Sequence, residues 1–141
     1  MGVIHMISEV NHINLSVRDL EVSFHFYTEV LGFKPLAKWR EGAYLLAGTL
    51  WFCLNLDPTT RAEPLLEYTH IAFSISSQDF SLLSKAIIDA GVVIWKKNTS
   101  PGDSLYFLDP DGHKLELHTS DWKARIQIAK EENWEGMEFF V

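Results

Sequence analysis

The chain has 141 residues, 47% of them hydrophobic and 13% aromatic, which is enough for one folded domain with a core. Its formal net charge of −7 argues against the broad basic face that nucleic acid requires. Cys53 is the only cysteine, so an intrachain disulfide is excluded, and no segment approaches the roughly 18 apolar residues of a membrane span. We therefore expect a soluble, cytoplasmic protein that binds neither nucleic acid nor a membrane.

An internal repeat organises the chain. The stretch HINLSV at 12–17 matches HIAFSI at 70–75 in character at nearly every position. Each stretch precedes apolar residues spaced three and four apart, which predicts a helix. These residues are Leu20, Phe24, Tyr27 and Leu31 in the first copy and Phe80, Leu83, Ile87 and Ala90 in the second. Gly32 and Gly91 then stand where each helix should stop.

The remaining elements follow from alternating patterns and turn signals. Strands are predicted at 33–39, 43–46 and 49–56 in the first copy and at 92–96, 104–108 and 113–118 in the second. Residues 57–67 form the linker, and a terminal helix over 120–131 begins at Ser120 or Asp121. We expect one α+β domain over 1–141, with βαβββ modules at about 9–57 and 67–118 and a C-terminal helix and tail at 120–141.

Strand alternation gathers polar side chains on one face of the predicted sheet. His12, Asn14 and Ser16 share one side of their strand, while the apolar residues between them should face the helices. The same rule aligns polar residues along the strands of the second copy. A sheet with helices on one face and polar groups on the other suggests a concave cup that binds a ligand.

His12, His70 and Glu116 are the candidate ligands of a divalent metal. The two histidines hold the same position in related strands, so pseudo-symmetry would bring them together. Two imidazoles and one carboxylate suit Mn, Fe, Zn or Ni and leave coordination positions open. The alternative is that each is an ordinary hydrogen-bonded residue. His5, His25, His113 and His118 lack this symmetry and are expected to be structural or exposed.

Four stretches resemble the fosfomycin-resistance glutathione transferases of the vicinal oxygen chelate (glyoxalase-like) superfamily: NHINLSV, GAYLLAGTLWFCL, YTHIAFSI and GDSLYFLDPDGHKLELH. The resemblance covers almost the whole chain, and the last stretch, with the WK pair and an NxSxGxS loop, is the most specific. It implies a homodimer of paired βαβββ modules with a cupped mixed sheet. It also implies binding of Mn(II) and K(+) and addition of glutathione to the epoxide of fosfomycin.

Carried over residue by residue, the resemblance makes His12, His70 and Glu116 the manganese ligands, with His12 supplied by the opposite subunit. The implied potassium loop comprises Asn98, Ser100, Gly102 and Ser104. The implied phosphonate contacts are Lys96, Ser100, Ser104, Tyr106 and Arg125. Trp51 and Tyr68 match residues that line the substrate pocket, while Trp39 and Tyr44 match the thiol site. The side chains expected to act in catalysis are Asn14, Tyr44, Lys96, Tyr106 and Arg125.

The implied reaction needs no protein thiol, so Cys53 is expected to serve in packing. The chain departs from the family pattern at Asn14, where a threonine is common, and at Thr99, Pro101 and Trp134. These departures affect the predicted identity of the substrate more than the predicted metal site.

Four other functions remain open. An epoxide hydrolase of the same superfamily would need a carboxylate near Glu41, but Gly42 occupies the matching position. The thiol could instead be bacillithiol or cysteine. A metal-free drug-sequestering protein would not need the three candidate ligands. A glyoxalase I or dioxygenase would leave the cations of the phosphonate site unexplained.

Overall fold

The structure is a computed structural model that describes residue 2 and residues 4–141. It forms two compact units. Unit 1 comprises residues 1–66 together with 109–113, and unit 2 comprises residues 67–108 together with 114–141. A single domain over the whole chain remains a prediction.

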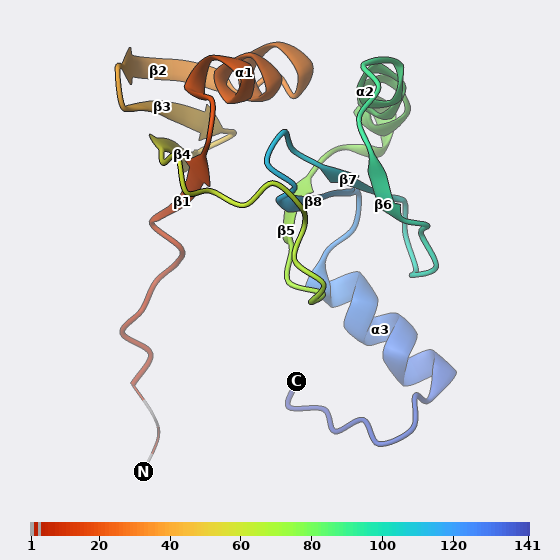
Figure 1. The fold of residues 1–141 in the computed structure, drawn as a ribbon. Coiled ribbons are helices and arrows are strands. Elements are labelled where there is room, and N and C mark those ends of the chain that lie inside the picture. Colours follow the sequence, from red (N-terminus) through yellow and green to blue (C-terminus); the bar gives the residue numbers. More distant parts are fainter. Residues whose placement is uncertain (1, 3) are drawn as a thin grey trace. The chain divides into compact units, whose positions relative to one another are not determined.

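Unit 1 contains one mixed sheet and one helical segment (Figure 1). Its elements are β1 (His12–Val17), α1 (Leu20–His25), η1 (Phe26–Val30), β2 (Lys34–Trp39), β3 (Gly42–Ala47) and β4 (Leu50–Leu56). The strand order is β1-β4-β3-β2, with β1 parallel to β4 and the other pairs antiparallel.

Unit 2 repeats this topology. Its elements are β5 (Ile71–Ser74), α2 (Ser77–Asp89), β6 (Ile94–Lys96), β7 (Ser104–Leu108), β8 (Lys114–His118) and α3 (Trp122–Glu132). The order β5-β8-β7-β6, with β5 parallel to β8, mirrors that of unit 1. The βαβββ repeat predicted from the sequence is confirmed.

The helices begin where side-chain oxygens can cap them. Asp19, Ser76 and Asp121 accept hydrogen bonds from backbone N–H groups three residues ahead, at distances of 2.9–3.1 Å. Asp121, one of the two residues predicted to start the terminal helix, is therefore its N-cap. The caps satisfy N–H groups that have no partner within the helix.

The first helix differs from the continuous helix predicted over 20–31. It is α-helical through His25 and then widens into the π-turn η1. This wider turn includes Phe26 and Tyr27, which are both buried. The Tyr27 hydroxyl donates to the Asp109 Oδ2 atom at 2.6 Å, so a polar contact in the core accompanies the irregular turn.

Each unit buries its own apolar face. Val17, Tyr27, Leu45, Phe52 and Leu54 are fully buried in unit 1, and Ile87, Phe107 and Leu115 in unit 2. Cys53 is also buried, and burial raises the pKa of its thiol, as expected for a packing residue. The polar faces of the strands lie outside these two apolar cores.

Candidate active site

His70 and Glu116 meet on the polar face of unit 2. His70 immediately precedes β5, and Glu116 lies on the neighbouring strand β8. The His70 Nε2 and Glu116 Oε1 atoms are 2.9 Å apart, and the Glu116 side chain is 8% exposed. The His70 Nδ1 atom lies 2.8 Å from the Tyr68 carbonyl oxygen, which can only accept. The Nδ1 proton therefore points to Tyr68, which leaves Nε2 to face Glu116 and, when it carries no proton, to bind a metal.

This pair fits a divalent cation. An Nε2 lone pair facing a carboxylate oxygen is repulsive unless a proton or a cation lies between them. Donor atoms bound at about 2.1 Å on adjacent corners of one coordination sphere lie about 3 Å apart, close to the observed separation. A backbone carbonyl that fixes the second ring nitrogen is the usual arrangement of a metal-binding histidine. The donor set therefore suits a metal ion such as Mn, Fe or Zn.

Lys96 is held as a fixed cation beside this pair. Its Nζ atom donates to the Tyr68 hydroxyl at 2.8 Å and lies 4.9 Å and 4.7 Å from the ring centres of Tyr68 and Tyr106. The hydrogen bond to Tyr68 is the main cause that raises the pKa of Lys96. The Tyr68 ring also packs against His70, with centroids 4.9 Å apart. A positive charge thus lies close to the candidate metal ligands.

The predicted potassium loop has an internal hydrogen-bond network. The Asn98 side-chain amide donates to the Gly102 carbonyl at 2.9 Å, and its oxygen accepts from Ser100 N–H and Oγ at 3.0 Å each. Arg125, on α3, donates to the Pro101 carbonyl at 3.4 Å. The loop is therefore a turn rich in oxygen atoms, with the cationic side chain of Arg125 against it.

Ser104 links the loop to the candidate ligands. Its Oγ atom lies 2.6 Å from the Glu116 Oε2 atom and 2.6 Å from the His118 Nδ1 atom. Tyr106, two residues further on β7, is buried, and its hydroxyl lies 3.4 Å from the Ser100 Oγ atom. The predicted residues of unit 2 therefore form one connected cluster.

Unit 1 places the other predicted residues in a row of rings across its sheet. The neighbouring ring centres His12–Trp51, Trp51–Tyr44 and Tyr44–Trp39 are 4.7, 5.2 and 4.8 Å apart. Each ring comes from a different strand, in the order β1, β4, β3 and β2. Asn14 accepts a hydrogen bond from the Asn55 amide at 2.9 Å. Trp39 and Tyr44, which are expected at the thiol site, thus lie in the same row of rings as His12, the third candidate metal ligand.

A second group with metal-type donor atoms lies in unit 1: Asp109, Asp111 and His113, with ligand atoms within 4.8 Å of one another. Burial raises the pKa of Asp109. Its Oδ1 atom accepts from the N–H groups of Asp111 and His113, and its Oδ2 atom from Tyr27.

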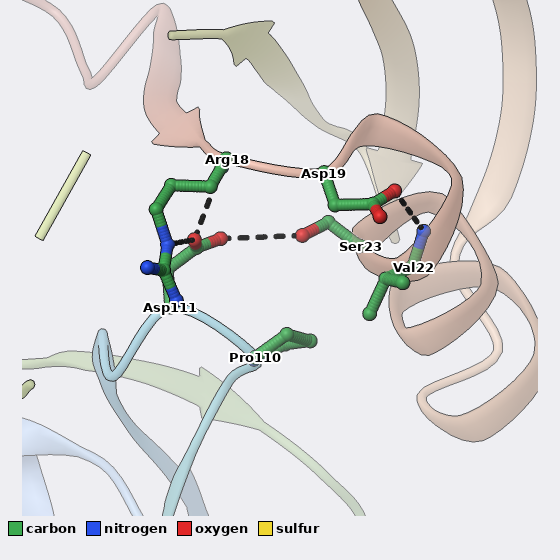
Figure 2. Close-up of a pocket in the computed structure, with 6 residues that line it drawn as sticks. All are labelled: Arg18, Asp19, Val22, Ser23, Pro110 and Asp111. Atoms are coloured by element: carbon green, nitrogen blue, oxygen red, sulfur yellow. Dashed lines mark hydrogen bonds and ion pairs between the residues drawn. The ribbon is translucent and has the colours of Figure 1, made fainter. Parts of the chain in front are cut away.

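The other donor atoms of this group are also engaged. Figure 2 shows Asp111 between Arg18 and Ser23, which donate to its two oxygens at 3.0 and 3.3 Å, beside a cavity of about 250 Å³. The His113 ring nitrogens contact the Ser16 carbonyl and the Arg61 guanidinium. We therefore assign this group to the stability of the fold and not to a metal site.

Sequence reasoning missed three partners of the site. His118, which was expected to be structural or exposed, contacts Ser104 directly. Trp95 packs against His70, Tyr68 and Tyr106, and Asn55 holds Asn14. An alternation signal existed for His118, which shares a strand face with Glu116. No local signal identified the other two.

Comparisons with known proteins place the chain in a family. The family model described as the Glyoxalase/Bleomycin resistance protein/Dioxygenase superfamily matches residues 9–117. The glutathione transferase FosA of Serratia marcescens is 47% identical over 95% of this chain and 96% of its own. The metallothiol transferase FosB of Staphylococcus epidermidis is 42% identical over 90% of this chain and 92% of its own.

A solved structure of a mutant of the fosfomycin resistance protein FosX of Listeria monocytogenes, in complex with Mn(II) and 1S,2S-dihydroxypropylphosphonic acid, is also similar. It has a TM-score of 0.76 and 27% identity, and the match covers 86% of this chain and 99% of that chain. Among the described residues, no helix is long and apolar enough to cross a membrane. The chain belongs to the glyoxalase/bleomycin resistance protein/dioxygenase superfamily.

Proposed function

We propose that this chain is a metal-dependent glutathione transferase that inactivates fosfomycin by opening its epoxide ring. The observation that carries the proposal is the His70–Glu116 pair beside Lys96, because it combines a donor set suited to a metal with a fixed positive charge. The relatives named glutathione transferase and metallothiol transferase support the reaction class. The Mn(II) complex of FosX supports Mn(II) as the metal.

In this proposal His70, Glu116 and His12 would hold the metal, which when bound would supply a Lewis acid for opening the epoxide. Lys96 and Arg125 offset the negative charge of the phosphonate, and the hydroxyls of Ser100 and Tyr106 orient it. The glutathione thiol gives up its proton, its sulfur bonds to one epoxide carbon, the bond from that carbon to oxygen breaks, and the oxygen takes up one proton, so that no net proton is gained or lost. A K(+) ion in the loop around Asn98 would add further positive charge.

The row of rings in unit 1 is the proposed thiol site. Trp39 and Tyr44 are 42% and 38% exposed, so their rings are accessible to a co-substrate. Glutathione is favoured over other thiols because FosA is the more similar of the two transferases named above. A cytoplasmic location belongs to the same proposal, since glutathione keeps that compartment reducing.

A homodimer with shared sites completes the proposal. His12 lies in unit 1, whereas His70 and Glu116 lie in unit 2. The His12 Nδ1 atom is 2.8 Å from the Asn11 side-chain oxygen, which leaves its Nε2 atom as the ligand atom, as in His70. We infer that each site takes His12 from one subunit and the other two ligands from its partner.

The hydrolase alternative is disfavoured by the space around Gly42. A Cβ atom at this position would lie 2.7 Å from the Leu54 carbonyl oxygen and 2.7 Å from the Trp39 ring. An acidic side chain that activates water therefore does not fit at this position. The neighbouring Glu41 is exposed at the turn between β2 and β3.

Loss of free thiol tests the proposal directly. The purified protein with Mn(II) and fosfomycin should consume glutathione, and faster than bacillithiol or cysteine at equal concentration. The Glu116→Gln variant should consume none, and omission of fosfomycin should stop the loss. Loss of fosfomycin at the same rate without any thiol would instead identify a hydrolase.

A further inference from the structure

The two oxygen atoms of Glu116 have different partners. The Oε1 atom faces His70 Nε2 at 2.9 Å, whereas the Oε2 atom lies 2.6 Å from the Ser104 hydroxyl and 3.5 Å from His118 Nδ1. The side chain is almost fully buried, so these contacts define its environment. One oxygen is therefore directed toward the candidate metal position, and the other is engaged by the protein.

The directions of the hydrogen bonds follow from the number of protons. An ionised carboxylate only accepts, so the single Ser104 hydroxyl proton points to Glu116. The Ser104 oxygen must then accept from the other close partner, His118 Nδ1, at 2.6 Å. The His118 ring therefore carries its proton on Nδ1, and a directed chain runs from His118 through Ser104 to Glu116.

Packing holds the His118 ring in this orientation. The His118 side chain is 16% exposed. A Cβ atom at Gly102, where φ is +85°, would lie 3.2 Å from the His118 Cε1 atom and 3.3 Å from the Ser120 Cβ atom. The loop backbone thus lies directly against the ring, and only a residue without a side chain fits there unstrained.

We propose that His118 is a positioning residue for the metal site: it fixes the Ser104 hydroxyl on Glu116 Oε2, so that only Oε1 is free to bind the metal. This inference rests on the proposed function, because it takes His70 and Glu116 as ligands. A carboxylate that binds through one oxygen leaves one more coordination position for substrate. Hydrogen-bonding partners of ligands commonly change metal affinity and geometry in this way.

The first test measures the dissociation constant for Mn(II) by the EPR signal of the free ion. His118→Ala should weaken Mn(II) binding roughly 10- to 100-fold. His118→Asn should restore most of the affinity, because its amide places an N–H donor near the position of Nδ1. The control is His25→Ala, which removes an exposed histidine of α1. Equal affinity of the wild type and His118→Ala would overturn the inference.

The second test asks whether His118 acts through Ser104. Ser104→Ala should weaken Mn(II) binding to a similar degree, and adding His118→Ala to it should cause little further loss. Fully additive losses would contradict the chain of hydrogen bonds. If His118→Ala fails to fold, Ser104→Ala and Ser104→Thr provide the same comparison, because threonine keeps the hydroxyl and should keep the affinity.

The results separate this inference from the proposed function. Loss of Mn(II) binding in His70→Ala, with unchanged binding in both His118→Ala and Ser104→Ala, overturns the inference alone. The expected affinities in a protein that never consumes glutathione support the inference and contradict the proposed reaction. A wild-type chain that binds no Mn(II) overturns both.

Discussion

At the scale of single residues, Lys96 is oriented before any substrate arrives. Its contacts with Tyr68 and Tyr106 fix the ammonium group, and its pKa is raised, so it stays protonated at least to the ordinary lysine value of 10.5. We predict that Lys96→Met lowers kcat/KM for fosfomycin by on the order of 10- to 100-fold, the usual loss for a charge-assisted hydrogen bond.

The matched control for this prediction is Lys97→Met, which removes the neighbouring exposed lysine. It should leave kcat/KM nearly unchanged, and neither variant should change Mn(II) affinity much. Equal losses in the two variants would mean that Lys96 contributes only to the overall charge of the protein.

The candidate ligands could be predicted at this scale because the repeat marked two histidines at equivalent strand positions. Glu116 also followed from strand alternation and the family pattern. The contacts of Trp95 with His70 and of Asn55 with Asn14 could not be predicted, because each joins residues distant in the sequence. The direction of the Ser104 hydroxyl likewise depends on distances that no sequence pattern encodes.

At the scale of elements, η1 and the turn at 109–113 are joined by the buried hydrogen bond from Tyr27 to Asp109. Burial, followed by the charge of Asp109, raises the pKa of Tyr27 well above its ordinary value of 10.0. Above pH 10 the unfolded chain therefore loses the Tyr27 proton while the folded chain keeps it, and stability falls as pH rises.

Replacing Tyr27 by phenylalanine removes both the hydrogen bond to Asp109 and the hydroxyl group that titrates. At pH 7 the variant should lose about 1–3 kcal/mol of unfolding free energy, because a buried acceptor loses its partner. Above pH 10 its stability should fall less steeply than that of the wild type, by up to ~1.4 kcal/mol per pH unit. Urea unfolding at several pH values measures both, with Tyr44→Phe as the control. Parallel pH profiles for the wild type and Tyr27→Phe would contradict this account.

Two glycines with similar φ angles distinguish the cost of a left-handed backbone from the cost of steric crowding around a Cβ atom. Gly32 and Gly112 have φ of +77° and +81°, so alanine at either should cost about 1–2 kcal/mol. A Cβ atom at Gly112 would also lie 2.8 Å from the Pro64 backbone nitrogen, whereas nothing lies within 4 Å at Gly32. Gly112→Ala should therefore destabilise the protein more than Gly32→Ala in urea unfolding. Equal losses would show that the turn at Gly112 relaxes freely.

Element types and order could be predicted well, because hydrophobic spacing and turn residues report on local structure. The π-turn at Phe26–Val30 could not, since i+3 and i+4 spacing does not distinguish it from an α-helix. The π-helical segment contains Tyr27, whose hydrogen bond to Asp109 joins residues 82 positions apart in the sequence.

At the scale of the whole molecule, the proposed sharing of ligands between subunits predicts complementation. His12→Ala and His70→Ala should each be inactive alone. Mixing the two as subunits should form about half heterodimers, each with one intact site, and recover about a quarter of wild-type activity. No recovery, despite heterodimers seen by native mass spectrometry, would place all three ligands within one chain.

The central claim is that the metal site of this chain directs a thiol onto an epoxide. Phosphorus NMR of fosfomycin incubated with the protein and Mn(II), with and without glutathione, tests it most directly. The account predicts a new adduct resonance that requires glutathione and is absent with His70→Ala. A diol resonance that forms without thiol, or an unchanged fosfomycin signal, would contradict it.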